Sequence, residues 1–430
     1  MKKFIFDVDG TLTPSRKQMD VGFSAEFLIF CCKYDTYLVT GSDRAKTIEQ
    51  VGSDIYNRCK RVFNCSGSDI YDGRNSVYRS DWKPSDELIS FLNDELDYSA
   101  FPVRTGDHIV ASNSLYGGTY NLLANTLPRF GITTTFVDPD DPNEFSKAVK
   151  SNTRAFFAES LGNPKLDVID LEGISKHARD AKVPFIVDNT IASPSLLNPI
   201  EYGANIVIHS LTKYITGNGT TLGGIIIDAG TFDYSSGRFP EFTEPSPSYH
   251  GLKYHEALGP LAFIAKTRVE GLRDLGSAPS PLNSFQVIQG LETLEVRMQK
   301  HSENALNIAK WLEEQSEVSW VNYPGLKSSK YNQLAKKYLK KGSSGIVTFG
   351  LKKGFEGAKK VAESTKIFAL LANIGDTKSL IIHPSSTTHS QLNIDEQKST
   401  GVTPDLVRIS VGIENLDDLK EDLKQSFAKI

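Results

Sequence analysis

The chain has 430 residues and is mildly acidic, with 48 Lys and Arg against 52 Asp and Glu and a net charge of −4. General nucleic-acid binding requires a basic face, so this balance argues against a nucleic-acid partner. No apolar run reaches the roughly 18 residues of a membrane span, so no membrane partner is expected. All four cysteines lie near the front of the chain, which predicts free thiols in a reducing cytoplasm: Cys31, Cys32, Cys59 and Cys65.

The front of the chain predicts a short strand–helix–strand unit. Residues 3–8 and 37–43 are apolar runs typical of strands, and residues 20–34 between them favour a helix. A further helix is predicted from Ser85, which suits an N-cap position.

From residue 107 onward the pattern becomes regular and predicts an α/β fold. Apolar, β-branched runs typical of buried parallel strands alternate there with helical patterns or loops. These runs are 108–112, 132–137, 154–159, 184–188, 205–209 and 223–228. A long structured loop is predicted over 229–256, one long amphipathic helix over 287–315, and two more strands over 345–350 and 406–412.

Polar residues at the ends of two of these strands predict a pyridoxal phosphate site. Lys213 follows the strand 205–209, where loss of solvent lowers the pKa of an amine and suits Schiff-base formation. The hydroxyls of Ser210 and Thr212 can hold a phosphate, and Asp188 can pair with a protonated pyridine nitrogen. Each residue alone has an ordinary explanation, a helix cap for Asp188 and a solvated loop for Lys213, but the combination at this spacing favours the cofactor.

Eight sequence words occur in one order over most of this region: SLYGGTYNLL (114–123), ESLGNPKLDV (159–168), VDNT (187–190), HSLTKY (209–214), EPSPSYHGL (244–252), NYPGL (322–326), NIGDTKSLIIHPSSTTHSQ (373–391) and VRISVGIE (407–414). In these words the chain resembles the Cys/Met-metabolism family of pyridoxal phosphate enzymes, and most closely its O-acetylhomoserine sulfhydrylase branch. The resemblance covers residues 107–430 and implies a fold-type I transferase body. By this resemblance, the region divides into a pyridoxal phosphate-binding large domain over 107–270, truncated at its N-terminus, and a C-terminal α+β domain over 271–430.

The resemblance implies a role for each matching site residue. Lys213 resembles the Schiff-base lysine, which also moves protons between substrate carbons, and Tyr116 resembles the tyrosine that stacks on the cofactor ring and assists proton transfer. Asp188 resembles the partner of the pyridine nitrogen, and Asn163 resembles the residue near the phenolic oxygen. The remaining implied contacts are with the cofactor phosphate, by Ser210 and Thr212, and with the substrate, by Arg408 and Asn373.

The reaction that this resemblance implies is γ-replacement on O-acetyl-L-homoserine. Acetate leaves, and sulfide or a thiol adds to give homocysteine or methionine. The implied cofactor is pyridoxal 5′-phosphate, and the implied partners are these small molecules. The family forms tetramers built from dimers, so a homo-oligomer is expected.

The front segment, residues 1–106, resembles a different family. The stretch FDVDGTLTPSR (6–16) is similar to the first motif of haloacid-dehalogenase-like phosphatases of the phosphomannomutase branch. Two carboxylates two residues apart at a strand end can both face a phosphate and a magnesium ion. The resemblance implies that Asp7 is the nucleophile, Asp9 the general acid/base and Thr11 a hydroxyl that stabilises the turn. It also implies that Thr40 or Ser42 contacts the phosphate. The later basic and acidic motifs of that family are missing, so only a partial βαβ segment is predicted, and no other metal site is expected.

The sulfhydrylase resemblance is also incomplete at its front. The family has about a hundred further residues there, including a Ser-Gly-x-Ala helix start that cups the phosphate and a Tyr-x-Arg from a neighbouring subunit. CSGS (65–68) and residues 56–58 match these words only by chance. The sequence thus predicts a phosphatase-like front joined to a sulfhydrylase body near residues 101–110. Two alternatives stay open: a magnesium-dependent phosphatase or phosphomannomutase, and a catalytically impaired fusion of two partial enzymes.

Overall fold

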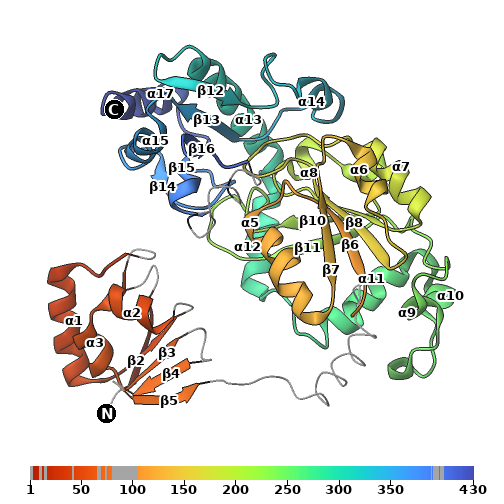
Figure 1. Ribbon diagram of the computed structural model, residues 1–430, viewed down its shortest axis with the longest axis horizontal. Coiled ribbons are helices and arrows are strands. Elements are labelled where there is room, and N and C mark those ends of the chain that lie inside the picture. Colours follow the sequence, from red (N-terminus) through yellow and green to blue (C-terminus); the bar gives the residue numbers. More distant parts are fainter. Residues whose placement is uncertain are drawn as a thin grey trace. The chain divides into compact units, whose positions relative to one another are not determined.

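The computed structural model describes residues 3–8, 12–13, 17–40, 43–64, 69–72, 75–79, 105–388, 390, 397 and 401–430. The chain forms two compact units, Met1–Ser90 and Phe91–Ile430, and each is described by itself (Figure 1). Within the described residues, no helix has the length and apolar character needed to cross a bilayer.

The first unit is a small α/β unit with a five-stranded sheet in the order β1-β2-β3-β4-β5. Strands β1 to β3 run parallel, whereas β4 is antiparallel to β3 and β5 is antiparallel to β4. The strands are β1 (Lys3–Asp7), β2 (Asp35–Val39), β3 (Arg61–Asn64), β4 (Asp69–Asp72) and β5 (Asn75–Arg79), and the helices are α1 (Val21–Lys33), α2 (Arg44–Val51) and α3 (Ser53–Arg58). The predicted strand–helix–strand unit is confirmed as β1–α1–β2. The helix predicted from Ser85 lies outside the described residues.

The centre of the second unit is a six-stranded sheet in the order β11-β10-β9-β8-β6-β7. Its strands are β6 (His108–Ser112), β7 (Thr133–Val137), β8 (Thr153–Glu159), β9 (Phe185–Asp188), β10 (Ile206–Ser210) and β11 (Gly224–Asp228). All six predicted strands are therefore present. The parallel orientation expected for β11 was wrong, because β11 pairs antiparallel with β10. The chain between them contains no crossover helix that would return it to the opposite end of the sheet.

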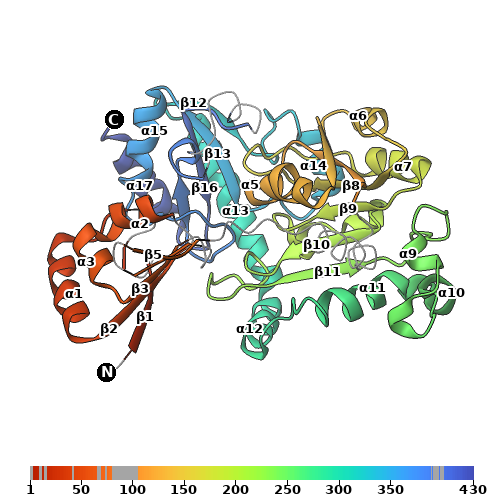
Figure 2. The ribbon, with the colours of Figure 1, turned by 60° about the horizontal axis from the view of Figure 1, so that its bottom comes forward.

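Helices cover both faces of this sheet (Figure 2). On one side lie α6 (Pro142–Lys147) and α7 (Leu171–Ala181), and on the other lies α11 (Ala262–Lys266). Helix α12 (Pro281–Glu292) contacts the segment before β11 through Asn283. The shorter helical segments are α5 (Gly117–Asn121), η2 (Leu122–Thr126), η3 (Leu127–Phe130), α8 (Ser193–Leu196), η4 (Pro199–Tyr202), η6 (Gly259–Leu261) and η7 (Thr267–Leu272). With both faces covered, strand residues such as Phe156 and Phe185 are fully buried.

Two predictions in the middle of the chain need correction. The expected loop over 229–256 contains short helical segments, namely α9 (Pro240–Thr243), η5 (Pro247–Tyr249) and the start of α10 (Tyr254–Leu258). The expected single helix over 287–315 is two helices, α12 and α13 (Leu294–Glu313), which meet at Thr293. Thr293 has φ −111° and ψ 2°, so the helical backbone is interrupted there although the apolar periodicity continues.

The C-terminal part of the second unit is built on a five-stranded sheet in the order β12-β13-β16-β15-β14. The predicted strands correspond to β13 (Ile346–Leu351) and β16 (Leu406–Ser410). Strands that the sequence did not reveal are β12 (Val318–Asn322), β14 (Ala369–Leu370) and β15 (Leu380–Ile382). The remaining helices are α14 (Asn332–Tyr338), α15 (Gly354–Ala362), η8 (Pro384–Ser386) and α17 (Leu416–Phe427). Buried residues of α13, α15 and α17 form one apolar core with the sheet.

Candidate functional site

The candidate site begins at the carboxyl ends of two neighbouring parallel strands. Asp188 is the last residue of β9, and it pairs in register with Ile208 of β10. The chain leaves β10 through a turn in which the backbone N–H of Lys213 donates to the carbonyl oxygen of Ser210 (3.3 Å). Carboxyl ends of parallel strands share one edge of a sheet, where open α/β sheets bind their ligands. The fold therefore brings Asp188, Ser210 and Lys213 to one edge.

The side chain of Lys213 is half-buried and points to the C-terminal part of the unit. Its Nζ donates to Oδ1 of Asn373. Burial, and secondarily the positive charge of Arg408, lower the pKa of Lys213. An amine with a lowered pKa has a larger unprotonated fraction, and this is the form that attacks a carbonyl carbon.

Arg408 lies on β16 and is nearly buried, with 8% of its surface exposed. Its Nη1 donates to Oδ1 of Asn163 (3.0 Å), and its Nη2 donates to the backbone oxygen of Asn373 (3.2 Å). Burial lowers the pKa of Arg408 to about 10. Among the described residues it has no ion-pair partner, so the guanidinium is suited to a carboxylate brought by a ligand.

The surroundings of Asp188 show whether this edge of the sheet fits pyridoxal phosphate. Its Oδ1 accepts the backbone N–H of Thr190 (2.8 Å), and burial raises its pKa. The residue beside it in register is a second acid, Glu159, and within the described residues neither carboxyl group forms an ion pair with a cation. A desolvated carboxylate without a cation is costly, and a protonated ring nitrogen would supply that cation. The residues present therefore fit the ring of the cofactor.

The remaining predicted cofactor contacts lie around the same edge. Tyr116 precedes α5, and its side chain is 56% exposed, which leaves the ring accessible for stacking. The backbone N–H of Ser210 donates to Oγ1 of Thr190 (2.8 Å), and Oγ1 of Thr212 accepts the backbone N–H of Gly223 (3.2 Å). Hydrogen bonds thus link Lys213, Asn373, Arg408 and Asn163. Glu159 links Tyr116 to Asp188 by a hydrogen bond and by strand register, and Ser210 and Thr212 lie in the segment that carries Lys213.

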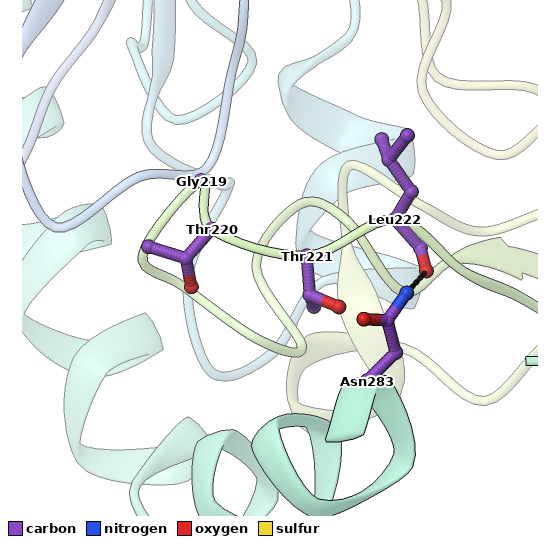
Figure 3. Close-up of a pocket in the computed structure, with 5 residues that line it drawn as sticks. All are labelled: Gly219, Thr220, Thr221, Leu222 and Asn283. Carbon is purple, nitrogen blue, oxygen red and sulfur yellow. Dashed lines mark hydrogen bonds between the residues drawn. The ribbon is translucent and has the colours of Figure 1, made fainter. Parts of the chain in front are cut away.

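A surface cavity of about 330 Å³ lies on the loop that follows Lys213 (Figure 3). It is lined by Gly219, Thr220, Thr221 and Leu222 and by Asn283 of α12, whose Nδ2 donates to the backbone oxygen of Leu222 (2.9 Å). Gly219 lies against Asp376 and Asn373, and a Cβ there would lie 2.7 Å from Oδ2 of Asp376. The cavity therefore borders the edge that carries the site.

Sequence reasoning missed three residues that support this site. Glu159 contacts the backbone of Tyr116, Thr190 links β9 to β10, and Arg297 binds the carbonyl groups that follow Lys213. Glu159 and Thr190 lie inside the words ESLGNPKLDV and VDNT, so their positions were visible in the sequence although their contacts were not. Arg297 lies in a helical pattern that gave no such signal.

In the first unit, Asp7 and Thr40 lie at the ends of neighbouring parallel strands. Asp7 is exposed and pairs with Val39, and Thr40 is buried. The other phosphatase-like candidates, Asp9, Thr11 and Ser42, fall outside the described residues, as does CSGS (65–68). Tyr56 is fully buried, and its hydroxyl accepts from Asn64 (2.8 Å), so it serves the core of this unit. The described residues contain no cluster of three or more His, Cys, Asp or Glu side chains suited to a metal ion.

Comparison with known proteins identifies the family of the second unit. The family model described as Cys/Met metabolism PLP-dependent enzyme matches residues 100–428. The O-acetyl-L-homoserine sulfhydrylase of Leptospira meyeri is 54% identical over 355 residues, which cover 80% of this chain and 78% of that protein. The homocysteine synthase of Schizosaccharomyces pombe is 49% identical over 327 residues, which cover 75% of this chain and 76% of that protein.

A solved structure extends the likeness to the fold. A Campylobacter jejuni protein described as an O-acetylhomoserine (thiol)-lyase, with N′-pyridoxyl-lysine-5′-monophosphate, is similar with a TM-score of 0.74 and 40% identity. The match covers 80% of this chain and 85% of that chain. The chain belongs to the Cys/Met metabolism family of PLP-dependent enzymes.

Proposed function

We propose that the second unit catalyses γ-replacement on O-acetyl-L-homoserine, in which sulfide or a thiol displaces acetate to give homocysteine or methionine. The observation that carries this proposal is the chain of contacts from Lys213 through Asn373 to Arg408 and Asn163. It sets an amine of lowered pKa beside a guanidinium without an acidic partner among the described residues, as an amino-acid substrate requires. Relatives at 49–54% identity are named for this chemistry.

The residues at this edge of the large sheet have separate roles. Pyridoxal phosphate, when bound, supplies the electron sink for negative charge on the substrate. Asp188 would keep the ring nitrogen of the bound cofactor protonated, and Ser210 and Thr212 would bind its phosphate. Arg408 binds the α-carboxylate with its two-pronged guanidinium, and Asn373 orients both Arg408 and Lys213.

Two residues of the edge handle protons. Nζ of Lys213 takes a proton from one substrate carbon and returns it at another, which its lowered pKa permits. Tyr116 would stack on the ring of the bound cofactor and assist the proton transfer. Asn163, in the loop that follows β8, accepts a hydrogen bond from Arg408 and holds it in place.

The covalent role of Lys213 can be tested directly. The protein would be incubated with pyridoxal phosphate, reduced with borohydride and digested for mass spectrometry. Lys213→Ala should abolish the reduced cofactor–lysine adduct, while the exposed control Lys176→Ala should keep it. A Lys213→Ala variant that traps cofactor at the same stoichiometry would identify a different lysine. Acetate and homocysteine should form from O-acetylhomoserine and sulfide in the control and not in the variant.

We propose that the large domain lacks the family's N-terminal part and therefore binds pyridoxal phosphate weakly. A helix start there would add backbone N–H donors to the phosphate contacts of Ser210 and Thr212. Each lost charge-assisted hydrogen bond costs roughly 1.5–3 kcal/mol, so losing two weakens binding about a hundredfold or more. Absorption titrations of this protein and of the Leptospira meyeri relative, done under the same conditions, measure the ratio of their affinities for pyridoxal phosphate. Equal affinities would contradict this proposal and would mean that other residues replace the phosphate contacts of the missing helix start.

We propose the domain organisation 1–106, 107–270 and 271–430, with a partial haloacid-dehalogenase-like segment in front. Supporting observations are the parallel β1–β2–β3 arrangement and the position of Asp7 and Thr40 at adjacent strand ends. We infer that this segment, which lacks the later acidic motifs, binds magnesium weakly and turns over sugar phosphates negligibly. Robust phosphate release that disappears in Asp7→Asn would favour the alternative magnesium-dependent phosphatase. Absence of both activities would favour the impaired fusion.

We propose that the protein is a homo-oligomer in the cytoplasm. Apolar side chains are strongly exposed on α12 and on the adjoining loop, namely Leu222, Leu282, Phe285, Ile288 and Leu291. Exposed apolar patches of this kind favour association. Light scattering should show a multimer that Phe285→Asp weakens.

The proposed location in the cytoplasm is supported by the described cysteines, which are free thiols.

A further inference from the structure

Glu159 is the last residue of β8 and is 5% exposed. It opens the word ESLGNP, yet neither the strand pattern nor the resemblance gave it a role. A buried acid needs a structural reason, because desolvation of a carboxyl group is costly unless hydrogen bonds or charges compensate for it.

The carboxyl group of Glu159 lies between two loops of the candidate site. Its Oε1 accepts the backbone N–H of Tyr116 (2.5 Å), at the start of α5. The backbone N–H of Asn163, in the loop that follows β8, is close enough to act on the pKa of this carboxyl group and lowers it. The side chain thus fixes the backbone of Tyr116 and lies beside that of Asn163.

Glu159 also lies beside Asp188. The two residues pair in register on the parallel strands β8 and β9, so their side chains point to the same face of the sheet. Burial and the charge of Asp188 raise the pKa of Glu159, and Asp167 acts in the same direction. The acidic groups facing Glu159 are therefore Asp188 and Asp167, and its backbone donors only partly oppose them. Adjacent buried carboxyl groups share one ionisation, since both charges together are strongly disfavoured.

We propose that Glu159 is a positioning residue: in its uncharged form it holds the backbone of Tyr116 in place beside Asn163, and it leaves the charge to Asp188. The protonated carboxyl group accepts the N–H of Tyr116 through Oε1, and it does not compete with Asp188 for the cationic ring nitrogen. This inference rests on the proposed roles of Tyr116 and Asn163, but not on the identity of the substrate.

Three variants separate position from charge. Glu159→Gln keeps an uncharged acceptor of the same length. Glu159→Asp keeps the acid but is shorter by one methylene, and Glu159→Ala removes the group. The matched control is Glu314→Ala, because Glu314 is exposed on the C-terminal part of the unit.

The first readout is amide hydrogen exchange of residues 114–120 without cofactor or substrate. This measurement stands even if the chain is not a sulfhydrylase. We expect slow exchange of the Tyr116 amide in the wild type, Glu159→Gln and Glu314→Ala, and an acceleration of about tenfold or more in Glu159→Asp and Glu159→Ala, as loss of one hydrogen bond predicts. The second readout is pyridoxal phosphate affinity, which should fall about tenfold or more in the same two variants only.

The opposite pattern overturns the proposal. If Glu159→Asp behaves as the wild type while Glu159→Gln loses protection and affinity, the negative charge of Glu159 is what matters. If all three Glu159 variants match Glu314→Ala, the residue positions nothing. Should Glu159→Ala fail to fold, as judged by circular dichroism, the contrast between Glu159→Gln and Glu159→Asp still decides the matter.

Discussion

Arg297 provides the clearest test of how the turn after Lys213 is held. It lies on α13 with 8% of its surface exposed. Its Nη1 donates to the backbone oxygen of Tyr214 (2.6 Å), and its Nη2 donates to those of Ile215 (3.1 Å) and Gly290 (2.7 Å). Its Nε donates to Oγ1 of Thr293 (3.1 Å), at the junction of α12 and α13. One guanidinium therefore ties that junction to the segment directly after Lys213.

Arg297→Ala would remove these donors and leave buried carbonyl oxygens without partners. A hydrogen bond from a charged donor contributes roughly 1.5–3 kcal/mol, and such contributions do not simply add. Part of the loss is recovered, because the arginine no longer has to be desolvated, and burial already lowers its pKa. We therefore expect the free energy of unfolding to fall by about 3–5 kcal/mol.

The assay is urea unfolding, followed by the fluorescence of Trp311 and Trp320 in this unit. Arg273→Ala is the control, because that side chain is exposed and, among the described residues, contacts only the neighbouring Asp274 and, at 5.3 Å from the centroid, the ring of Tyr249. It should move the transition midpoint much less than Arg297→Ala does, since an exposed cation–π contact contributes about 0.5–1 kcal/mol. Arg297→Lys keeps the charge but not the planar fork and should fall between the two. The reasoning is refuted if Arg297→Ala and Arg273→Ala unfold at the same urea concentration.

Three further outcomes follow from the structure. Gly290→Ala should lower the free energy of unfolding by about 1–3 kcal/mol, because its Cβ would lie 2.4 Å from the backbone oxygen of Ile215, whereas Gly224→Ala, with its nearest atom at 3.9 Å, should be tolerated in the same urea titration. Arg408→Lys should raise KM for O-acetylhomoserine about tenfold or more with a smaller change in kcat, since a point charge replaces the fork; an unchanged KM would remove Arg408 from the carboxylate site. Burial raises the pKa of Asp167 from 3.8 to about 6, so its protonation favours the folded state, and this stabilisation is present below pH 3.8 and is lost as the pH rises through 6. Between pH values of about 4 and about 7.5, the free energy of unfolding of the wild type should therefore fall by up to about 3 kcal/mol because of this ionisation. Asp167→Asn cannot ionise and should not show that loss, and parallel pH profiles of the two proteins would contradict this.

The site residues at the strand ends were predictable, because their place directly after an apolar run in the sequence decides where they lie in the fold. Asp188 and Lys213 follow apolar runs, and a parallel sheet brings such ends to one edge. The orientation of β11 was not predictable from its own residues, since the apolar run over 223–228 suits a strand of either direction. The direction depends on the connection from β10, which lacks a crossover helix.

The contacts that support the site were hidden for a different reason. An acid at a strand end and an arginine on an amphipathic helix have the same appearance in the sequence whether they face solvent or a buried backbone. Glu159 and Arg297 are distinguished only by the loops that pack on them. The break at Thr293 was hidden in the same way, because the apolar periodicity continues through it, and the close approach of Gly290 to Ile215 just before it has no signal in the sequence.

The candidate site draws its residues from two sheets that share part of one core, since Ile346 of β13 packs in the core of the large sheet. Asp188 and Ser210 belong to the large sheet, whereas Arg408 lies on the C-terminal sheet and reaches Asn163 across 245 residues of sequence. Asn373 completes the connection, because it contacts both Arg408 and Lys213. Since the guanidinium of Arg408 belongs to one sheet and Lys213 follows a strand of the other, the proposed recognition of an amino acid requires the apposition of both sheets and cannot come from either one alone.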